Sequence, residues 1–195
     1  MADEIGYQQQ TLTVYGHQNL ATLYVRIGRF DLARAYAEKG LRLAQEAEDI
    51  VTVSTLNSTM GTIEACCGDY GLAEAHYKVA LKGAREAQVS WIVSGVLIER
   101  GKAFFTQEKW DRGAACFRES LGIAKELEHQ EFIAEGLYGL ARAAAARDNV
   151  REARQQGMEA LAIFEELGHR DVDEVRRWLD DISDRDAPPT NMATR

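Results

Sequence analysis

Cysteine is the residue type in this chain best suited to nucleophilic or metal chemistry. The sequence holds three cysteines, Cys66, Cys67 and Cys116. Their spacing matches no metal-binding motif, and the neighbours Cys66 and Cys67 point to different sides of a helix. Thiols without a paired framework are typical of reduced, mostly buried cysteines in a cytosolic protein. We therefore expect no metal ligand among them and a cytoplasmic location.

The four histidines could supply a general base, but their spacing argues against catalysis. His129 and His169 are 40 residues apart, which places them in equivalent loops of a repeat. His17 and His76 lie on different kinds of helix, and no cysteine or carboxylate constellation accompanies them. No glycine-rich loop that could hold a phosphate occurs. The sequence thus offers no nucleophile–base pair, and we predict a protein that is not an enzyme and needs no cofactor.

The spacing of those two histidines belongs to a repeat that organises the whole chain. Four related segments, GRFDLA, GDYGLA, EKWDRG and DNVREA, begin at positions 28, 68, 108 and 148. Small residues recur with the same period, in one column at 21, 61, 101 and 141 and in a second at 33, 73, 113 and 153. A leucine column follows at 41, 81, 121 and 161. A period of 40 residues is typical of a solenoid, whose units bury their apolar faces by stacking.

Composition predicts that the units are helical. The only prolines are Pro188 and Pro189, and the rest of the chain is rich in good helix formers. We expect an all-α fold: a right-handed α-solenoid of four helix-turn-helix repeats with a C-terminal capping helix. The expected helices are roughly 11–27 and 30–47, 51–67 and 70–87, 90–107 and 110–128, and 131–147 and 150–167.

The same pattern predicts how the chain is divided. A lead-in at 1–10 precedes an array at 11–183, and a disordered tail follows at 184–195. The repeats within the array are 11–48, 51–88, 90–128 and 131–168. An amphipathic stretch at 171–183 has helical spacing and no repeat after it, so we expect it to cover the last apolar face. That stretch contains Val172, Val175, Trp178, Leu179 and Ile182.

Charge and hydropathy exclude some classes of partner. The net charge is −8 and the isoelectric point about 5.1, which disfavours nucleic-acid binding because phosphates require a basic face. No run approaches the ~18–20 apolar residues that cross a bilayer, so we expect no membrane contact. The acidic N-terminus lacks the basic start and apolar core of a signal peptide.

The repeat columns resemble those of a known family. A small residue in each first helix and a second one twelve residues later are followed, in two units, by an aromatic residue, Tyr77 or Phe117. A further small column holds Gly40, Ala80, Ser120 and Ala160. Together these columns resemble the tetratricopeptide repeat (TPR) over about residues 11–167, although Ala37 and Gly157 replace the aromatic residue in the outer units. The long second helices are similar to those of kinesin light chains, Pins-type adaptors and the sensor arrays of STAND regulators.

The resemblance implies that the first helix of each repeat lines a concave face. It thereby implies a non-catalytic protein–protein interaction module that binds a peptide or helix with acidic and apolar anchors. The candidate partner-binding residues are Gln18, Thr22, Arg26, Thr62, Ile98, Lys102, Phe105, Tyr138 and Arg142. Two alternatives remain: solvated helix faces without a partner, and a self-associating or regulatory array that acts through its end faces as a homo-oligomer.

Two charged residues occupy columns that are apolar in the other repeats. Glu64 shares a column with Tyr24 and Phe104, and Arg100 shares one with Leu20 and other apolar residues. A buried charge is costly without a partner, so one interpretation is that Glu64 and Arg100 pair across adjacent units. The other interpretation is that each side chain reaches water separately.

Overall fold

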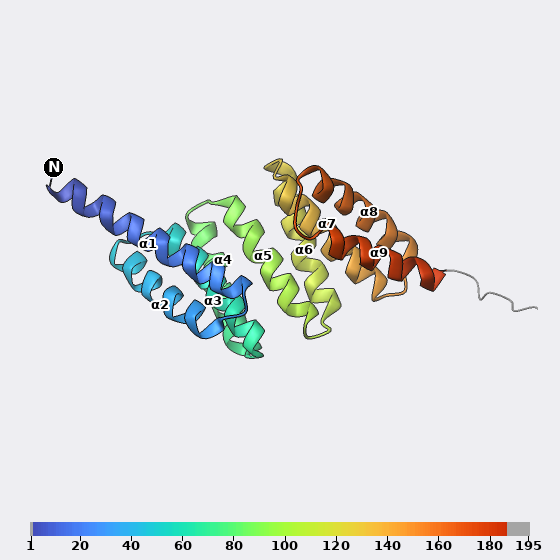
Figure 1. The fold of residues 1–195 in the computed structure, drawn as a ribbon, viewed down its shortest axis with the longest axis horizontal. Coiled ribbons are helices and arrows are strands. Elements are labelled where there is room, and N and C mark those ends of the chain that lie inside the picture. Colours follow the sequence, from blue (N-terminus) through green and yellow to red (C-terminus); the bar gives the residue numbers. More distant parts are fainter. Residues whose placement is uncertain (1, 187–195) are drawn as a thin grey trace, which may run out of the picture. The chain divides into compact units, whose positions relative to one another are not determined.

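The protein is described here by a computed structural model that covers the backbone of residues 2–186 and the side chains of residues 12–182. Within these residues all regular secondary structure is α-helical (Figure 1). The helices are α1 (Ala2–Arg26), α2 (Phe30–Glu46), α3 (Ile50–Cys67), α4 (Tyr70–Glu86), α5 (Ser90–Phe105), α6 (Trp110–Glu126), α7 (Gln130–Ala145), α8 (Val150–Glu166) and α9 (Val172–Asp186).

The helix bounds follow the repeat, with differences at the two ends. Helices α2 to α8 begin and end within a few residues of their predicted positions. However, α1 begins at Ala2, so the segment 1–10 continues the first helix instead of forming a separate lead-in. At the other end α9 extends to Asp186, beyond the predicted end at 183. The rest of the expected disordered tail, residues 187–195, lies outside the described residues.

The chain divides into two compact units, residues 1–103 and residues 104–195, with the boundary in the last turn of α5. In the first unit α1 packs on α2 and α3, and α3 packs on α4. Its core includes Ala21, Leu56 and Ile63, none of which has exposed surface. In the second unit α7 packs on α6 and α8, and α9 packs on α8 through Val175 and Ile182. The amphipathic C-terminal stretch therefore does cover the preceding helix.

The turns between helices repeat a left-handed residue in two columns. At the predicted column Gly28 and Gly68 have positive φ, and so do Glu108 and Asp148, whose φ angles are 57° and 58°. Glycine takes this conformation without strain, whereas a side chain makes it less favourable. A second column, which the sequence reading missed, holds Glu48, Gln88, Glu128 and Gly168 between repeats. The chain thus reverses direction in the same way about every 20 residues.

The predicted pair between Glu64 and Arg100 is wrong. Arg34 of α2 donates both terminal nitrogens to Glu64 of α3, with 3.0 Å from Nη2 to Oε2. Arg100 of α5 instead donates to Glu74 of α4, with 2.9 Å from Nε to Oε2. Positions 34 and 74 are equivalent in the repeat, so one column on the second helices neutralises both charges, with its sign reversed to suit. A column alignment identifies a buried charge but does not say which neighbouring helix faces it.

The same unit contains a histidine that should make its stability depend on pH. Nδ1 of His76 on α4 lies 3.0 Å from Oδ1 of Asn57 on α3. Burial lowers the pKa of His76, an effect that Glu64 opposes and Arg34 reinforces. A lowered pKa means that the unfolded chain binds the proton first, so this stability is present above about pH 6.5 and is lost as the pH falls through the folded-state pKa.

We therefore expect urea unfolding to require less urea at pH 5.5 than at pH 7.5, and His76→Gln to reduce that difference. A pH dependence unchanged by His76→Gln would assign the effect to other groups.

Candidate functional site

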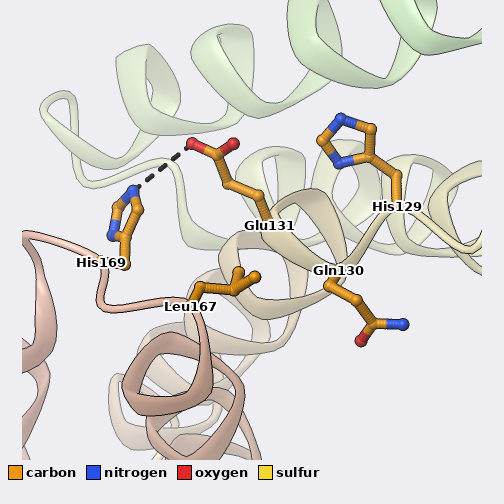
Figure 2. A pocket seen from close by; sticks show the side chains of 5 residues that line it. All are labelled: His129, Gln130, Glu131, Leu167 and His169. Atoms are coloured by element: carbon orange, nitrogen blue, oxygen red, sulfur yellow. Dashed lines mark ion pairs between the residues drawn. The ribbon is translucent and has the colours of Figure 1, made fainter.

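An open hollow of about 370 Å³ lies between two inter-repeat turns of the second unit (Figure 2). The residues that line it are His129, Gln130, Glu131, Leu167 and His169. Figure 2 shows the carboxylate of Glu131 directed at the ring of His169, with 3.4 Å between Oε1 and Nε2. Two histidines and a carboxylate are residue types that could perform acid–base chemistry. The hollow is therefore the first place to look for a catalytic site.

The imidazole rings in this hollow have structural roles. Nδ1 of His129 accepts the backbone N–H of Phe132 at the start of α7, and the His129 ring stacks on Phe132. Nδ1 of His169 accepts the N–H of Asp171, and that ring stacks on Phe164. As the spacing predicts, the two histidines occupy equivalent turns. No serine, threonine or cysteine lines the hollow, so it contains no side-chain nucleophile for a histidine to activate.

The cysteines differ from expectation in their exposure. Cys116 is buried, but Cys66 and Cys67 are exposed, because they form the last turn of α3 where the helix reaches the surface. Burial of part of its side chain, together with Cys67 and Glu99, raises the pKa of Cys66. Among the described side chains no three His, Cys, Asp or Glu residues converge as ligands for a metal ion.

In the first unit three predicted partner-binding residues lie on α1. Arg26 and Thr22 are exposed, and the Thr22 hydroxyl donates to the backbone oxygen of Gln18 at 3.1 Å. Gln18 is half-buried, and its Oε1 has no hydrogen-bond partner within the described part of the chain. These side chains offer hydrogen bonds and one cation, but they do not form a shaped site.

Two further predicted residues of that unit join a polar cluster between α3 and α5. Thr62 lies 3.2 Å from the Tyr77 hydroxyl and donates to Glu99 at 3.4 Å. Lys102 donates to the other carboxylate oxygen of Glu99 at 2.9 Å. Glu99 thus already accepts a hydrogen bond from the lysine that we expected to bind an acidic partner, which makes Lys102 a weaker anchor for one.

Two of the predicted contact residues are core residues. Ile98 and Phe105 are 1% and 4% exposed, so neither can touch a partner. The ring of Phe105 packs on Trp110 and Phe117, with centroids 4.9 Å and 5.1 Å apart. Both residues lie on α5, where nearly every side chain after Trp91 is buried or half-buried. Their assignment to a surface is therefore wrong, because α5 is more enclosed than α1.

The remaining two predicted residues form a coherent face on α7. Tyr138 and Arg142 are one helical turn apart and half-buried. The guanidinium of Arg142 lies 5.8 Å from the centre of the Tyr138 ring and 5.4 Å from that of Phe105. The Tyr138 ring also meets the ring of Trp178 on α9 edge to face at 5.3 Å. We call Tyr138, Arg142 and Trp178 the α7 face.

Hydrogen bonding and burial fix the protonation state of this face. The Tyr138 hydroxyl donates to Oε1 of Glu174 at 3.3 Å. Burial raises the pKa of Tyr138, the Glu174 carboxylate raises it further, and Arg142 opposes the shift. The phenol therefore stays protonated near neutral pH. The sequence reading missed Glu174 and Trp178, although the helical spacing of the C-terminal stretch predicts that α9 packs nearby.

Comparisons with known proteins place this arrangement in a fold class. The chain is similar to the crystal structure of BtubC (BKLC) from P. vanneervenii, with 20% identity and a TM-score of 0.74, over 94% of this chain and 78% of that one. It is also similar to the apo form of RapI, with 17% identity and a TM-score of 0.71, over 95% of this chain and 53% of RapI. The chain thus spans about half of RapI.

Sequence comparisons add no family. No protein-family model matches the chain, and no curated protein matches it by sequence. Of the helices that the structure describes, none has the length and hydropathy to cross a bilayer. The structural likenesses confirm the fold class that the 40-residue period predicts: the chain is an all-α helical-repeat protein.

Proposed function

We propose that this protein is a non-catalytic protein-binding module whose α7 face takes a segment of a partner with an acidic residue beside an apolar one. The observation that carries the proposal is the state of Arg142. Its guanidinium lies over two aromatic rings, and no carboxylate among the described side chains pairs with it. An arginine held in place without an acidic partner is suited to bind one from another molecule.

The stacking makes Arg142 a better anchor than an exposed arginine. A cation over an aromatic ring is attracted by the negative face of the ring, and contact with two rings restricts the side chain before binding. The planar guanidinium can still present two parallel N–H groups to a carboxylate. Lys102 differs in both respects, since it already donates to Glu99 and ends in a single ammonium group.

The neighbouring aromatic residues supply the apolar part of the site. Tyr138 and Trp178 are half-buried, so each keeps some surface that a partner can cover. Tyrosine, tryptophan and arginine are the residue types that most often dominate binding energy in protein interfaces. Both aromatic rings are fixed by contacts within the unit, which lowers the entropy lost on binding.

Other observations favour a protein partner and no reaction. The net charge of −8 disfavours nucleic acid, and the histidines of the open hollow cap the turns at the starts of α7 and α9. The resemblance to TPR proteins implies binding on first helices, and α7 is the first helix of the fourth repeat. A cytoplasmic location would suit the exposed thiols of Cys66 and Cys67.

Selection from a displayed peptide library tests this proposal. We expect the selected peptides to share an acidic residue next to an aromatic or aliphatic one. Arg142→Glu should weaken binding of such a peptide at least about thirtyfold, roughly 2 kcal/mol, because two like charges then meet in a partly desolvated site. Isothermal titration calorimetry measures the change.

Arg154→Glu is the matched control, since Arg154 is exposed on α8 and makes the same change in net charge. It should leave the affinity almost unchanged, and Arg142→Lys should lie between the two. Equal losses for Arg142→Glu and Arg154→Glu, or selected peptides without an acidic position, would refute the α7 face as the site.

A further inference from the structure

Helix α1 carries an exposed apolar stripe. Leu12, Leu23 and Ile27 are 71%, 50% and 58% exposed, and Leu20 is 36% exposed. They recur at intervals of three or four residues once Gly16 is included, so they lie on one side of the helix. A Cβ atom added at Gly16 would have no atom within 4 Å, so the middle of the stripe is open. We call these five residues the α1 stripe.

The α1 stripe is an inter-repeat face without a neighbour in the described part of the chain. The opposite side of α1, with Val14 and Ala21, is buried within the first unit. One repeat later, the first four stripe positions are occupied by residues that α3 buries. These are Thr52, Leu56, Met60 and Ile63. Helix α2 packs on α3, whereas no described helix lies on the equivalent side of α1.

The absence of charge indicates what kind of surface can cover the stripe. No Asp, Glu, Lys or Arg occurs between Glu4 and Arg26, although such residues make up 28% of the chain. A partner with a charged surface gains nothing there and loses hydration. A second copy carries the same net charge of −8, and it can approach without local repulsion only where this charge is missing.

The order of large and small residues matches the stripe to itself. In an antiparallel arrangement centred between Asn19 and Leu20, Gly16 faces Leu23 of the second copy, and Leu12 faces Ile27. A glycine opposite a leucine lets the side chain fill the space left by the missing one, as close helix packing requires. A two-fold axis creates both of these contacts twice, because each copy contributes the same patch.

We infer that a second copy of this chain covers the α1 stripe by packing its own α1 antiparallel, which makes the protein a weak homodimer. The stretch from Leu12 to Ile27 is only about 22 Å long at the rise of an α-helix. It buries less than the ~800 Å² per partner of a standard interface, so association is expected only at high protein concentration. The α7 face lies in the other unit and is independent of this contact.

Sedimentation equilibrium of the full chain over about 5–300 µM tests the inference. The wild type should shift from monomer to dimer across this range. Leu23→Glu places two carboxylates in the interface and should weaken dimerisation at least about tenfold. Val79→Glu is the matched control, because Val79 is 51% exposed on α4, and it should dimerise like the wild type.

A second variant separates a specific contact from non-specific adhesion. Gly16→Leu adds apolar surface but fills the space that Leu23 of the second copy requires, and the open surroundings of Gly16 leave the monomer undisturbed. We expect weaker dimerisation, at least about fivefold, with unchanged thermal unfolding at low concentration. Stronger association of Gly16→Leu would mean that the stripe is merely adhesive and would overturn the inference.

Disulfide trapping tests the orientation. With Cys66 and Cys67 changed to serine, Asn19→Cys lies near the two-fold axis and should form a covalent dimer on mild oxidation. Leu12→Cys should not, because the two copies of residue 12 are about 22 Å apart in the antiparallel arrangement. Trapping through residue 12, or a monomer at every concentration, would contradict the second copy as the occupant.

Discussion

Gly139→Ala should destabilise the second unit by about 2 kcal/mol, although alanine is the better helix former. Gly139 lies within α7, and a Cβ atom there would be 2.4 Å from the ring of Phe117 on α6. Phe117 is only 2% exposed and its ring also packs on Phe105, so it has little room to move. Overpacking therefore outweighs the ~1 kcal/mol that alanine gains in an α-helix. Urea unfolding followed by circular dichroism measures the difference.

The same substitution at Gly122 provides the control. Gly122 lies within α6, and a Cβ atom there would meet nothing within 4 Å. Gly122→Ala should stabilise the protein by roughly 0.5–1 kcal/mol, so the two variants should move in opposite directions. Phe117→Leu should also reduce the cost of Gly139→Ala, since it removes the ring from the clash. A stabilising Gly139→Ala would show that α6 and α7 lie further apart than described.

Arg34→Met should cost about 3 kcal/mol of stability, because it leaves a buried carboxylate without its partner. Glu64 is 3% exposed and accepts both of its hydrogen bonds from Arg34. Removing one member of a buried pair typically costs 3–5 kcal/mol. We expect the lower end because the side chain of Arg34 is 35% exposed, so water can reach the site. Chemical unfolding again provides the measurement.

Replacing both members distinguishes a lost pair from lost packing. Arg34→Met combined with Glu64→Leu should recover most of the stability, because no uncompensated charge is then buried. Arg42→Met, on the exposed side of the same helix, should change the free energy of unfolding by less than about 0.5 kcal/mol. If the double variant were as unstable as Arg34→Met, the buried charge would not be the cause.

The period of the sequence predicts most of the fold because each repeat must satisfy the same contacts. The columns of small residues are buried in every unit, with Ala21, Ala33, Ala141 and Ala153 fully enclosed. The turn column predicts left-handed residues even at Glu108, which has no glycine to mark it. Such features are local or recur with the period, so aligned columns reveal them.

Contacts between neighbouring helices were harder to predict. Glu64 and Arg100 were correctly identified as charges in apolar columns, but their partners come from the column of Arg34 and Glu74. Choosing between partners requires the distance between helices, which a repeat pattern does not contain. The same limit explains Phe105, which lies in a first-helix column yet is enclosed by Trp110 and Phe117.

The candidate site shows both outcomes. Tyr138 and Arg142 follow from helical spacing within one helix, so the sequence is sufficient to place them together. Their neighbours Trp178 and Glu174 lie on α9, 36 or more residues further along the chain. The pairing of Lys102 with Glu99 is local, at a spacing of three residues, and sequence reading could have found it.

A charge exchange across the proposed interface tests the central claim most directly. A peptide selected on the wild type is resynthesised with its acidic anchor replaced by lysine, and both peptides are titrated into wild type and Arg142→Glu. The account predicts that the wild type prefers the acidic peptide, and that Arg142→Glu prefers the lysine peptide by about tenfold or more. If both proteins ranked the two peptides alike, Arg142 would not contact the anchor, and the α7 face would not be the binding site.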